Sequence, residues 1–225
     1  MPTSFRRPRR SMLPLALAAA AVGLSAAVSY VPAARADFPT PSIAPIAWEV
    51  DFEYRTPKRI LVDLPGQSGP TAFWYMVYEV VNDSDEEIFF RPDVDLQTQD
   101  GKVLPANYNL PPAVFDAINR RTRSLNLQRA QNMVGKLLVG EDRGKAGVAI
   151  WREPSAEMGS FDIFFEGLSG EIARVTGPDG KEMTDADGNP IIVRKTKHLS
   201  FKIRGDDINP GNDEVVRTGD RWIMR

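Results

Sequence analysis

The sequence of 225 residues contains no cysteine and a single histidine, His198. Because cysteine is absent, disulfides, thiolate metal sites, cysteine nucleophiles and redox motifs are excluded, and the fold must rest on its hydrophobic core. The sequence also lacks a glycine-rich phosphate-binding loop and a Gly-x-Ser-x-Gly nucleophile motif. These absences remove several common enzyme classes.

Acidic residues are missing from the first 36 positions, which begin with a basic, arginine-rich segment. Residues 12–31 are rich in alanine and leucine, and Ala34-Arg35-Ala36 is typical of a cleavage site before Asp37. We therefore predict that residues 1–36 form a cleaved signal peptide and that the protein is exported, to the periplasm or the extracellular space. The alternative is a retained membrane anchor, although this segment is weakly apolar.

The export route stays open, because Arg9-Arg10 followed by Met12 and Leu13 also resembles a twin-arginine signal. Removing residues 1–36 takes away five arginines and leaves 23 basic and 30 acidic side chains, a net charge of −7. This balance argues against nucleic-acid binding. The remaining 189 residues predict one domain with no stable membrane anchor.

The stretch at residues 71–104 organises our prediction of the fold. Residues 72–81 are aromatic or β-branched at most positions, and both faces of the predicted strand are apolar. The segment at 82–85 and Asp100-Gly101 are typical of turns, so we predict that three strands form an antiparallel meander here. We interpret the aromatic residues as core; a sugar-stacking platform is the alternative.

Further strand patterns surround this stretch and predict a mainly β protein. They occur at residues 48–54, 60–64, 146–151, 161–166, 171–175, 191–193 and 199–203. We predict an antiparallel immunoglobulin-like β-sandwich domain at 48–204. A proline-rich linker at 37–47 precedes it, and a polar tail with an apolar end at 205–225 follows it.

The hydrophobic period changes at residues 111–138, where a helical hairpin is expected as an insertion. Val114, Phe115 and Ile118 share one helical face, and a second apolar stripe follows. Its members are Leu127, Ala130, Val134 and Leu137. Because a two-sheet sandwich covers only one face of each sheet, we predict that this hairpin shields the second apolar face of the strand at 72–81.

The predicted hairpin is basic, with a net charge of +4 against −11 for the rest of the mature chain. We identify four arginines as candidate binding residues for an anionic partner: Arg120, Arg121, Arg123 and Arg129. A solvated basic helix face on an acidic body is the alternative.

Other candidate sites have weaker signals. Asp185, Asp187 and Asn189 have the spacing of the start of a calcium loop, but Pro190 and Thr196 occupy positions that require glycine and glutamate. We interpret the segment as a β-turn and keep a weak calcium site as the alternative. His198 is interpreted as a surface residue, with a Ser-His-Asp triad left open. Paired acids such as Asp93 and Asp95 are expected on a solvent face.

Two stretches carry a family resemblance: YMVYEVVNDSDEEIFF at 75–90 and GKAGVAIWREPSAEMGSFDIFFEGLSGE at 144–171. They resemble bacterial secreted immunoglobulin-like, telokin-like β-sandwich proteins of uncharacterised function. The resemblance implies an envelope or secreted sandwich and transfers no functional residue or cofactor. We therefore expect a non-catalytic envelope protein that binds, assembles or supports, with an envelope protein or glycan as partner. A carboxylate-dependent, glycosidase-like hydrolase is the alternative.

Overall fold

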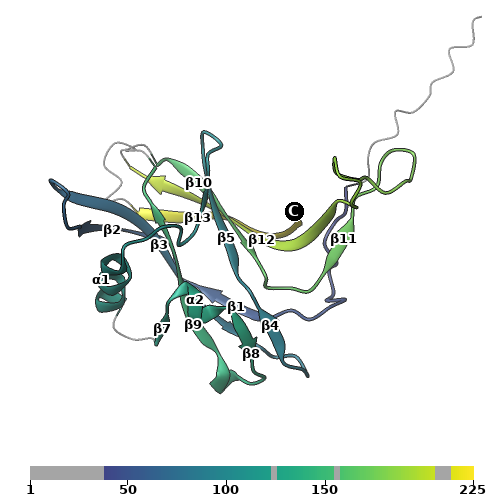
Figure 1. Cartoon of the computed structure of the whole chain (residues 1–225), viewed down its shortest axis with the longest axis horizontal. Helices are drawn as coiled ribbons and strands as arrows, with labels where there is room; N and C mark the ends of the chain where they lie inside the picture. The colour runs from purple at the N-terminus through teal and green to yellow at the C-terminus, as the bar shows by residue number, and fades with distance from the viewer. Residues whose placement is uncertain (1–37, 123–125, 155–157, 206–213) are drawn as a thin grey trace, which may run out of the picture. The chain divides into compact units, whose positions relative to one another are not determined.

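Two β-sheets face each other in the computed structural model, which describes residues 38–122, 126–154, 158–205 and 214–225 (Figure 1). Within these residues the first sheet has five strands in the order β1-β3-β9-β7, and β2 pairs with the same edge of β3 as β1. All its pairs are antiparallel except β7 with β9. Its strands are β1 (Asp51–Tyr54), β2 (Lys58–Asp63), β3 (Pro70–Val81), β7 (Leu127–Gln128) and β9 (Lys145–Arg152).

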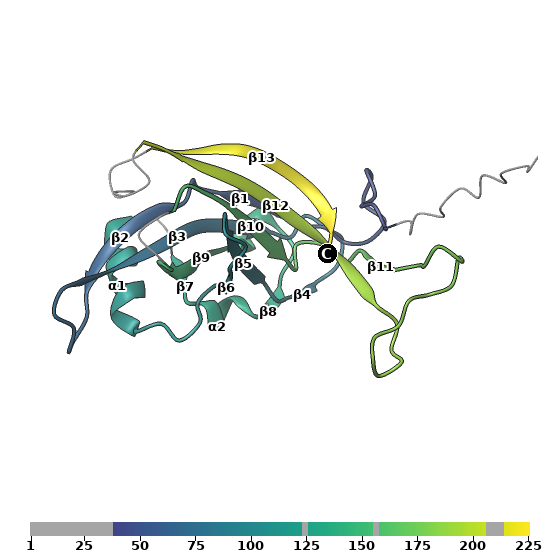
Figure 2. The ribbon, with the colours of Figure 1, turned by 90° about the horizontal axis from the view of Figure 1, so that it is seen from above.

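The second sheet is entirely antiparallel and has six strands among the described residues. Its order is β11-β12-β10-β5-β6, and β13 pairs with the free side of β12 as a long hairpin partner (Figure 2). Its strands are β5 (Asp93–Thr98), β6 (Val103–Pro105), β10 (Ser160–Glu166), β11 (Ile172–Arg174), β12 (Ile192–Arg204) and β13 (Glu214–Met224).

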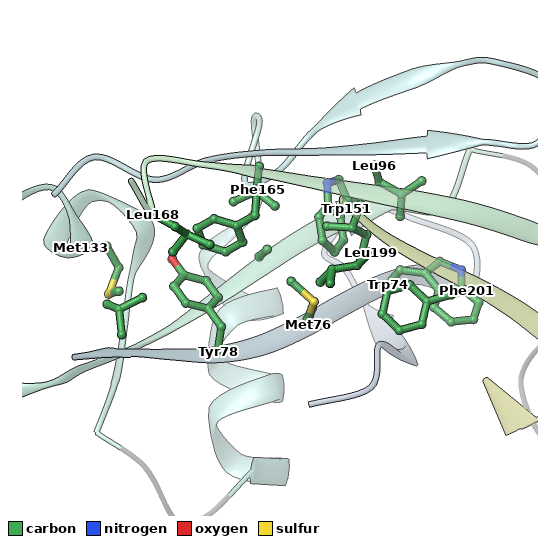
Figure 3. Close-up of a cluster of buried hydrophobic side chains, with 14 of the residues drawn as sticks. Trp74, Met76, Tyr78, Leu96, Met133, Trp151, Phe165, Leu168, Leu199 and Phe201 are labelled. Atoms are coloured by element: carbon green, nitrogen blue, oxygen red, sulfur yellow. The ribbon is translucent and has the colours of Figure 1, made fainter. Parts of the chain in front are cut away.

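The main core lies between these two sheets and is rich in aromatic rings (Figure 3). Trp74 and Tyr78 from β3 contact Phe161 and Phe165 from β10, with ring centroids 5.5 Å and 4.8 Å apart. Burial of such large apolar surfaces supplies the main driving force for folding in a chain without disulfides. The aromatic residues of β3 are therefore core residues, as predicted, and do not form an exposed sugar platform.

A second core covers the opposite face of β3. Phe73, Tyr75 and Val77 are buried there together with Val114 and Ile118 of helix α1 (Pro112–Thr122). The helix begins at Pro112, whose ring fixes a backbone angle suited to the first helical position. Figure 1 shows α1 beside β2 and β3. The prediction that the 111–138 insertion shields this face is thus confirmed for its first helix.

The predicted second helix does not form. Residues 126–138 contain β7, the one-turn helix α2 (Ala130–Met133) and strand β8 (Gly135–Leu137). Gly135 has φ of +135°, which favours glycine and ends the helical pattern. Strand β8 pairs with β4 (Ile88–Phe90), and Leu137 lies in the core between the sheets. Leu127 instead packs against the second core beside α1, so the predicted stripe is divided between the two cores.

The predicted meander is also wrong in its pairing. Strand β3 pairs with β1, β2 and β9, whereas β5 pairs with β10 and β6 in the opposite sheet. The chain crosses between the sheets through β4. Of the predicted reversals, the β5–β6 hairpin is present, with the amide of Gly101 bonded to the carbonyl of Thr98 at 2.9 Å.

Both ends of the expected domain carry more structure than the sequence indicates. Strand β13 accounts for most of the segment expected to be a polar tail, and Met224 is buried. In the expected linker, the amide of Ser42 donates a 2.8 Å hydrogen bond to Glu171. The expected leader at 1–36 lies outside the described residues. In the part of the chain that the structure describes, no helix has the length and apolar character needed to cross a membrane.

Candidate functional site

An open cleft of about 540 Å³ lies at one end of the second sheet. Four separate segments form it: the chain before β1, the β4–β5 connection, the β10–β11 connection and the start of β12. Its lining combines two aromatic rings, two carboxylates, two guanidinium groups and a glycine-rich wall. These residues are Trp48, Phe89, Arg91, Asp93, Glu166, Gly167, Ser169, Gly170, Ile172 and Arg194.

Two glycines allow the walls of the cleft to approach closely. Gly170 lies against Trp48, and a Cβ at this position would come within 2.5 Å of the indole Nε1. Gly167 has φ of +87°, and a Cβ there would collide with the carbonyl oxygen of Arg91. The amide of Gly170 also donates a 2.9 Å hydrogen bond to the carbonyl oxygen of Trp48, which keeps these two segments close together. The cleft geometry therefore depends on glycine at both positions.

The two carboxylates of the cleft are neighbours across strands, because Glu166 of β10 lies opposite Asp93 of β5. Burial raises the pKa of Glu166 above its ordinary value, and the negative charge of Asp93 adds to this effect, while Arg225 and Arg194 oppose it. Glu166 thus gains a proton more easily than an exposed glutamate does.

In the residues that the structure describes, the charged side chains of the cleft do not form hydrogen bonds or ion pairs with one another. Within the described part of the chain, the side chains of Arg91, Asp93, Glu166 and Arg194 make no hydrogen bond or ion pair. Polar groups farther along the same sheet are paired: Arg225 contacts Asp95 at 2.8 Å. Arg91, Asp93 and Arg194 are exposed and Glu166 is half-buried, so water satisfies these groups and a ligand in the cleft can replace that water.

The aromatic residues frame these polar groups. Trp48 is half-buried and packs against the main core, whereas Phe89 is 66% exposed, although it lies on a strand whose neighbours Ile88 and Phe90 are buried. An exposed ring beside uncommitted polar groups is typical of a binding surface.

A buried ion cluster lies next to the cleft and holds its walls together. Lys195, which is 2% exposed, contacts Glu49 at 2.9 Å, Glu171 at 3.4 Å and the carbonyl oxygen of Ser42 at 3.1 Å. Burial alone would raise the pKa of Glu171, but hydrogen bonds from Ser42 and the charge of Lys195 outweigh it and lower the pKa. Because Glu49 follows Trp48 and Glu171 follows Gly170, this cluster positions both sides of the cleft.

A second cleft, of about 510 Å³, lies between β1 and β13. Its polar groups already bind one another: the hydroxyl of Tyr54 donates to Asp220 at 2.9 Å and accepts from Arg217 at 2.9 Å. Lys197 contacts the same Asp220 at 2.6 Å. This cleft therefore offers a ligand fewer open polar groups than the first.

The four arginines predicted as a binding patch have different surroundings. Arg129 contacts Asp116 at 2.7 Å and lies 4.4 Å from the centre of the Phe115 ring. Arg121 donates a 3.3 Å hydrogen bond to the carbonyl of Arg59. Arg120 is exposed at the end of α1. Arg123 lies outside the described residues. The other three arginines lie on or near α1, and two of them, Arg121 and Arg129, already bind other groups of the chain.

His198 is more buried than predicted, with a side chain 11% exposed and stacked on Phe164. Its Nε2 lies 2.9 Å from Asp162 and 3.4 Å from the hydroxyl of Ser200, while Arg221 donates to its Nδ1. In a catalytic triad the hydroxyl and the carboxylate lie at opposite ring nitrogens. Here both lie at the same nitrogen, so the cluster lacks the order of a triad.

The candidate calcium segment forms a β-turn. One oxygen of Asp185 accepts hydrogen bonds from the amides of Asp187 and Asn189, both at 2.9 Å. These bonds lower the pKa of Asp185. Within the described residues, no three His, Asp or Glu side chains are grouped to hold a metal ion.

Sequence reasoning identified Asp93 as one of several possible paired acids but missed the rest of the cleft. Its residues are spread from Trp48 to Arg194, and only the folded sheet brings them together. The available local signals were the glycines that follow the aromatic strand β10 and the isolated Trp48.

Comparison with known proteins finds no matching family model and no match among curated proteins or solved structures.

Proposed function

We propose that this chain is an exported, non-catalytic binding module of the cell envelope whose ligand occupies the cleft beside Trp48. The observation that carries this proposal is the set of four charged side chains that line the cleft without partners among the described residues. The glycine-dependent walls and the adjacent ion cluster give the cleft a fixed shape, which reduces the entropy cost of binding.

An immunoglobulin-like architecture belongs to this proposal and is supported by the strand order. The chain's β1/β2, β3 and β9 occupy one sheet, and β5, β10 and β12 occupy the other. This alternation matches the distribution of the A, B, E and C, F, G strands in immunoglobulin sandwiches. Strand β13 and the β4–β8 pair are additions to that scheme.

Export is supported by the sequence of residues 1–36, with its basic start, alanine-rich segment and Ala-x-Ala site. An exported chain meets envelope proteins and glycans, and we propose one of these as the partner.

The proposed function is tested by co-sedimentation of the protein, purified after export, with washed cell-envelope fragments. Arg194→Gln removes a cleft guanidinium and should weaken binding roughly tenfold, as for a charged hydrogen bond. Arg120→Gln makes the same charge change on α1 and serves as the control. Equal binding by wild type and Arg194→Gln, or no binding at all, would contradict the proposal.

One observation favours a second function, a carboxylate-dependent glycoside hydrolase. Asp93 and Glu166 lie opposite each other in the cleft, and the pKa of Glu166 is raised, as suits a general acid. Asp93 would then act as base or nucleophile. A screen for reducing ends released from envelope glycans decides between the two: turnover that disappears in Glu166→Gln supports the hydrolase, and binding without turnover supports the binding module.

A further inference from the structure

We infer that the ligand of this cleft is a glycan, held by stacking of sugar rings on Trp48 and Phe89 and by hydrogen bonds to the four charged side chains. The inference rests on the proposed binding function and specifies its ligand. It follows from three properties of the cleft, namely its hydrogen-bonding groups, its charge balance and its aromatic rings.

The hydrogen-bonding groups suit hydroxyls. Each sugar hydroxyl both donates and accepts, so a site for several hydroxyls needs acceptors and donors close together. Asp93 and Glu166 supply carboxylate acceptors from adjacent strands, while Arg91 and Arg194 supply guanidinium donors. A carboxylate and a guanidinium can each engage two neighbouring hydroxyls through their paired oxygen or nitrogen atoms.

The charge balance argues against a strongly charged ligand. Two arginines and two acids line the cleft, so its side chains sum to no net charge when all four are ionised. A site for an acidic peptide would be expected to carry an excess of arginine or lysine. Here the charged groups act as hydrogen-bonding groups, and a neutral polyhydroxylated chain satisfies both signs at once.

The aromatic rings supply the apolar contact that a sugar ring requires. A pyranose presents polar edges and an apolar face of C–H groups, and the apolar face packs flat against an aromatic ring. The close approach of Gly170 restricts the position of Trp48, and Phe89 is exposed on β4 in the lining of the same cleft. The cleft volume of about 540 Å³ lies within the range of roughly 300–1,000 Å³ that is typical of small-ligand sites.

Isothermal titration of the full-length protein with chitotetraose and cellotetraose tests the inference, with hexaglutamate as the peptide probe. We expect at least one of the two tetrasaccharides to bind and hexaglutamate not to bind. Phe89→Ala should weaken saccharide binding roughly two- to tenfold through loss of one aromatic contact. Tyr108→Ala, which removes another highly exposed aromatic residue away from the cleft lining, is the matched control and should leave the affinity unchanged.

Trp48→Ala should reduce the affinity further, and Arg194→Gln provides a variant with little effect on the core if Trp48→Ala fails to fold. Binding of hexaglutamate in place of the saccharides, or saccharide binding that Phe89→Ala and Arg194→Gln leave unchanged, would overturn the inference. Failure of both tetrasaccharides would also overturn it. If envelope fragments still bind in an Arg194-dependent manner, the proposed function stands and only the glycan assignment fails; if they do not, both fail.

Discussion

Individual residues set the geometry of the cleft. Gly170 leaves space for Trp48, Lys195 neutralises the buried Glu171 and the half-buried Glu49, and Glu166 lies in surroundings that disfavour its charge. Each of these effects has a physical consequence that can be measured without knowing the ligand.

Gly170→Ala should destabilise the protein by about 1–3 kcal/mol, as for overpacking a well-packed site, because the new methyl group would displace the Trp48 indole. Gly69→Ala is the control, since a Cβ there meets no atom within 4 Å and its φ is not in the left-handed range. Urea unfolding of both variants makes the comparison. Equal stability of the two variants would mean that Trp48 is not held against Gly170.

Lys195→Met should cost about 3–5 kcal/mol, because it leaves the buried Glu171 and the half-buried Glu49 without their cation. Lys136→Met, at an exposed lysine paired with Glu87, should change stability little. Acid titration adds a second readout. Since the folded-state pKa of Glu171 is lowered, its stabilisation is present above its ordinary value of 4.5 and is lost as the pH falls through the folded-state pKa.

The contribution of Glu166 to the unfolding free energy should depend on pH in the opposite way to that of Glu171. The raised pKa of Glu166 means that ionising this carboxyl costs more in the folded chain than in the unfolded chain. The glutamine variant should therefore be more stable than wild type at neutral pH, and its advantage should shrink on acidification as the wild-type carboxyl is protonated. Glu86→Gln controls for the loss of an exposed charge. A pH-independent difference in unfolding free energy would contradict this assignment.

At the scale of elements, α1 is the cover of the first sheet. Val114 and Ile118 are fully buried against the outer face of β3 and β9, and without the helix these apolar side chains would face solvent. The insertion thus contributes a second core to a chain that has no disulfide to stabilise it.

Ile118→Ala should therefore cost about 2–5 kcal/mol, as for a buried aliphatic side chain. Arg120→Ala, two positions along the same helix but exposed, should change stability by no more than about 0.5 kcal/mol. Guanidinium chloride titrations of both variants provide the measurement. A cost for Ile118→Ala as small as that of Arg120→Ala would show that α1 is not docked on the sheet in solution.

The elements also show what sequence patterns can and cannot predict. The two apolar faces of residues 72–81 correctly indicated a buried strand with cover on both sides, and Pro111-Pro112 correctly indicated the start of a helix. Strand pairing was not predictable from the local pattern. Strand β4 pairs with β8, although 44 residues separate Phe90 from its partner Gly135, and such a pairing depends on tertiary contacts. The spacing of Leu127, Val134 and Leu137 is typical of a helix. The segment nevertheless forms β7, the one-turn helix α2 and β8, and Gly135 has a positive φ at the start of β8.

At the scale of the whole molecule, the candidate site is a product of the fold. Strand alternation predicted a solvent face for Asp93, but four segments separated in sequence had to meet before that acid lay in a cleft opposite Glu166. Sequence periodicity reports which face a residue occupies and not which distant residues share that face. The absence of cysteine excluded thiol chemistry. Composition carries no positional information, so it could not locate the cleft.

Processing belongs to the same scale. If residues 1–36 are a leader, intact-mass measurement on the exported protein should give a chain that starts at Asp37. A full-length, membrane-extracted product would contradict this expectation and favour a retained anchor.

The central claim is that the cleft beside Trp48 is the ligand site, and a chemical-shift titration of the full-length protein with chitotetraose tests it most directly. Amide resonances should shift around Trp48, Phe89, Gly167, Gly170 and Arg194, and those of α1 should stay in place. Shifts that gather instead around Arg120, Arg121 and Arg129, or that are absent at all concentrations, would contradict the account.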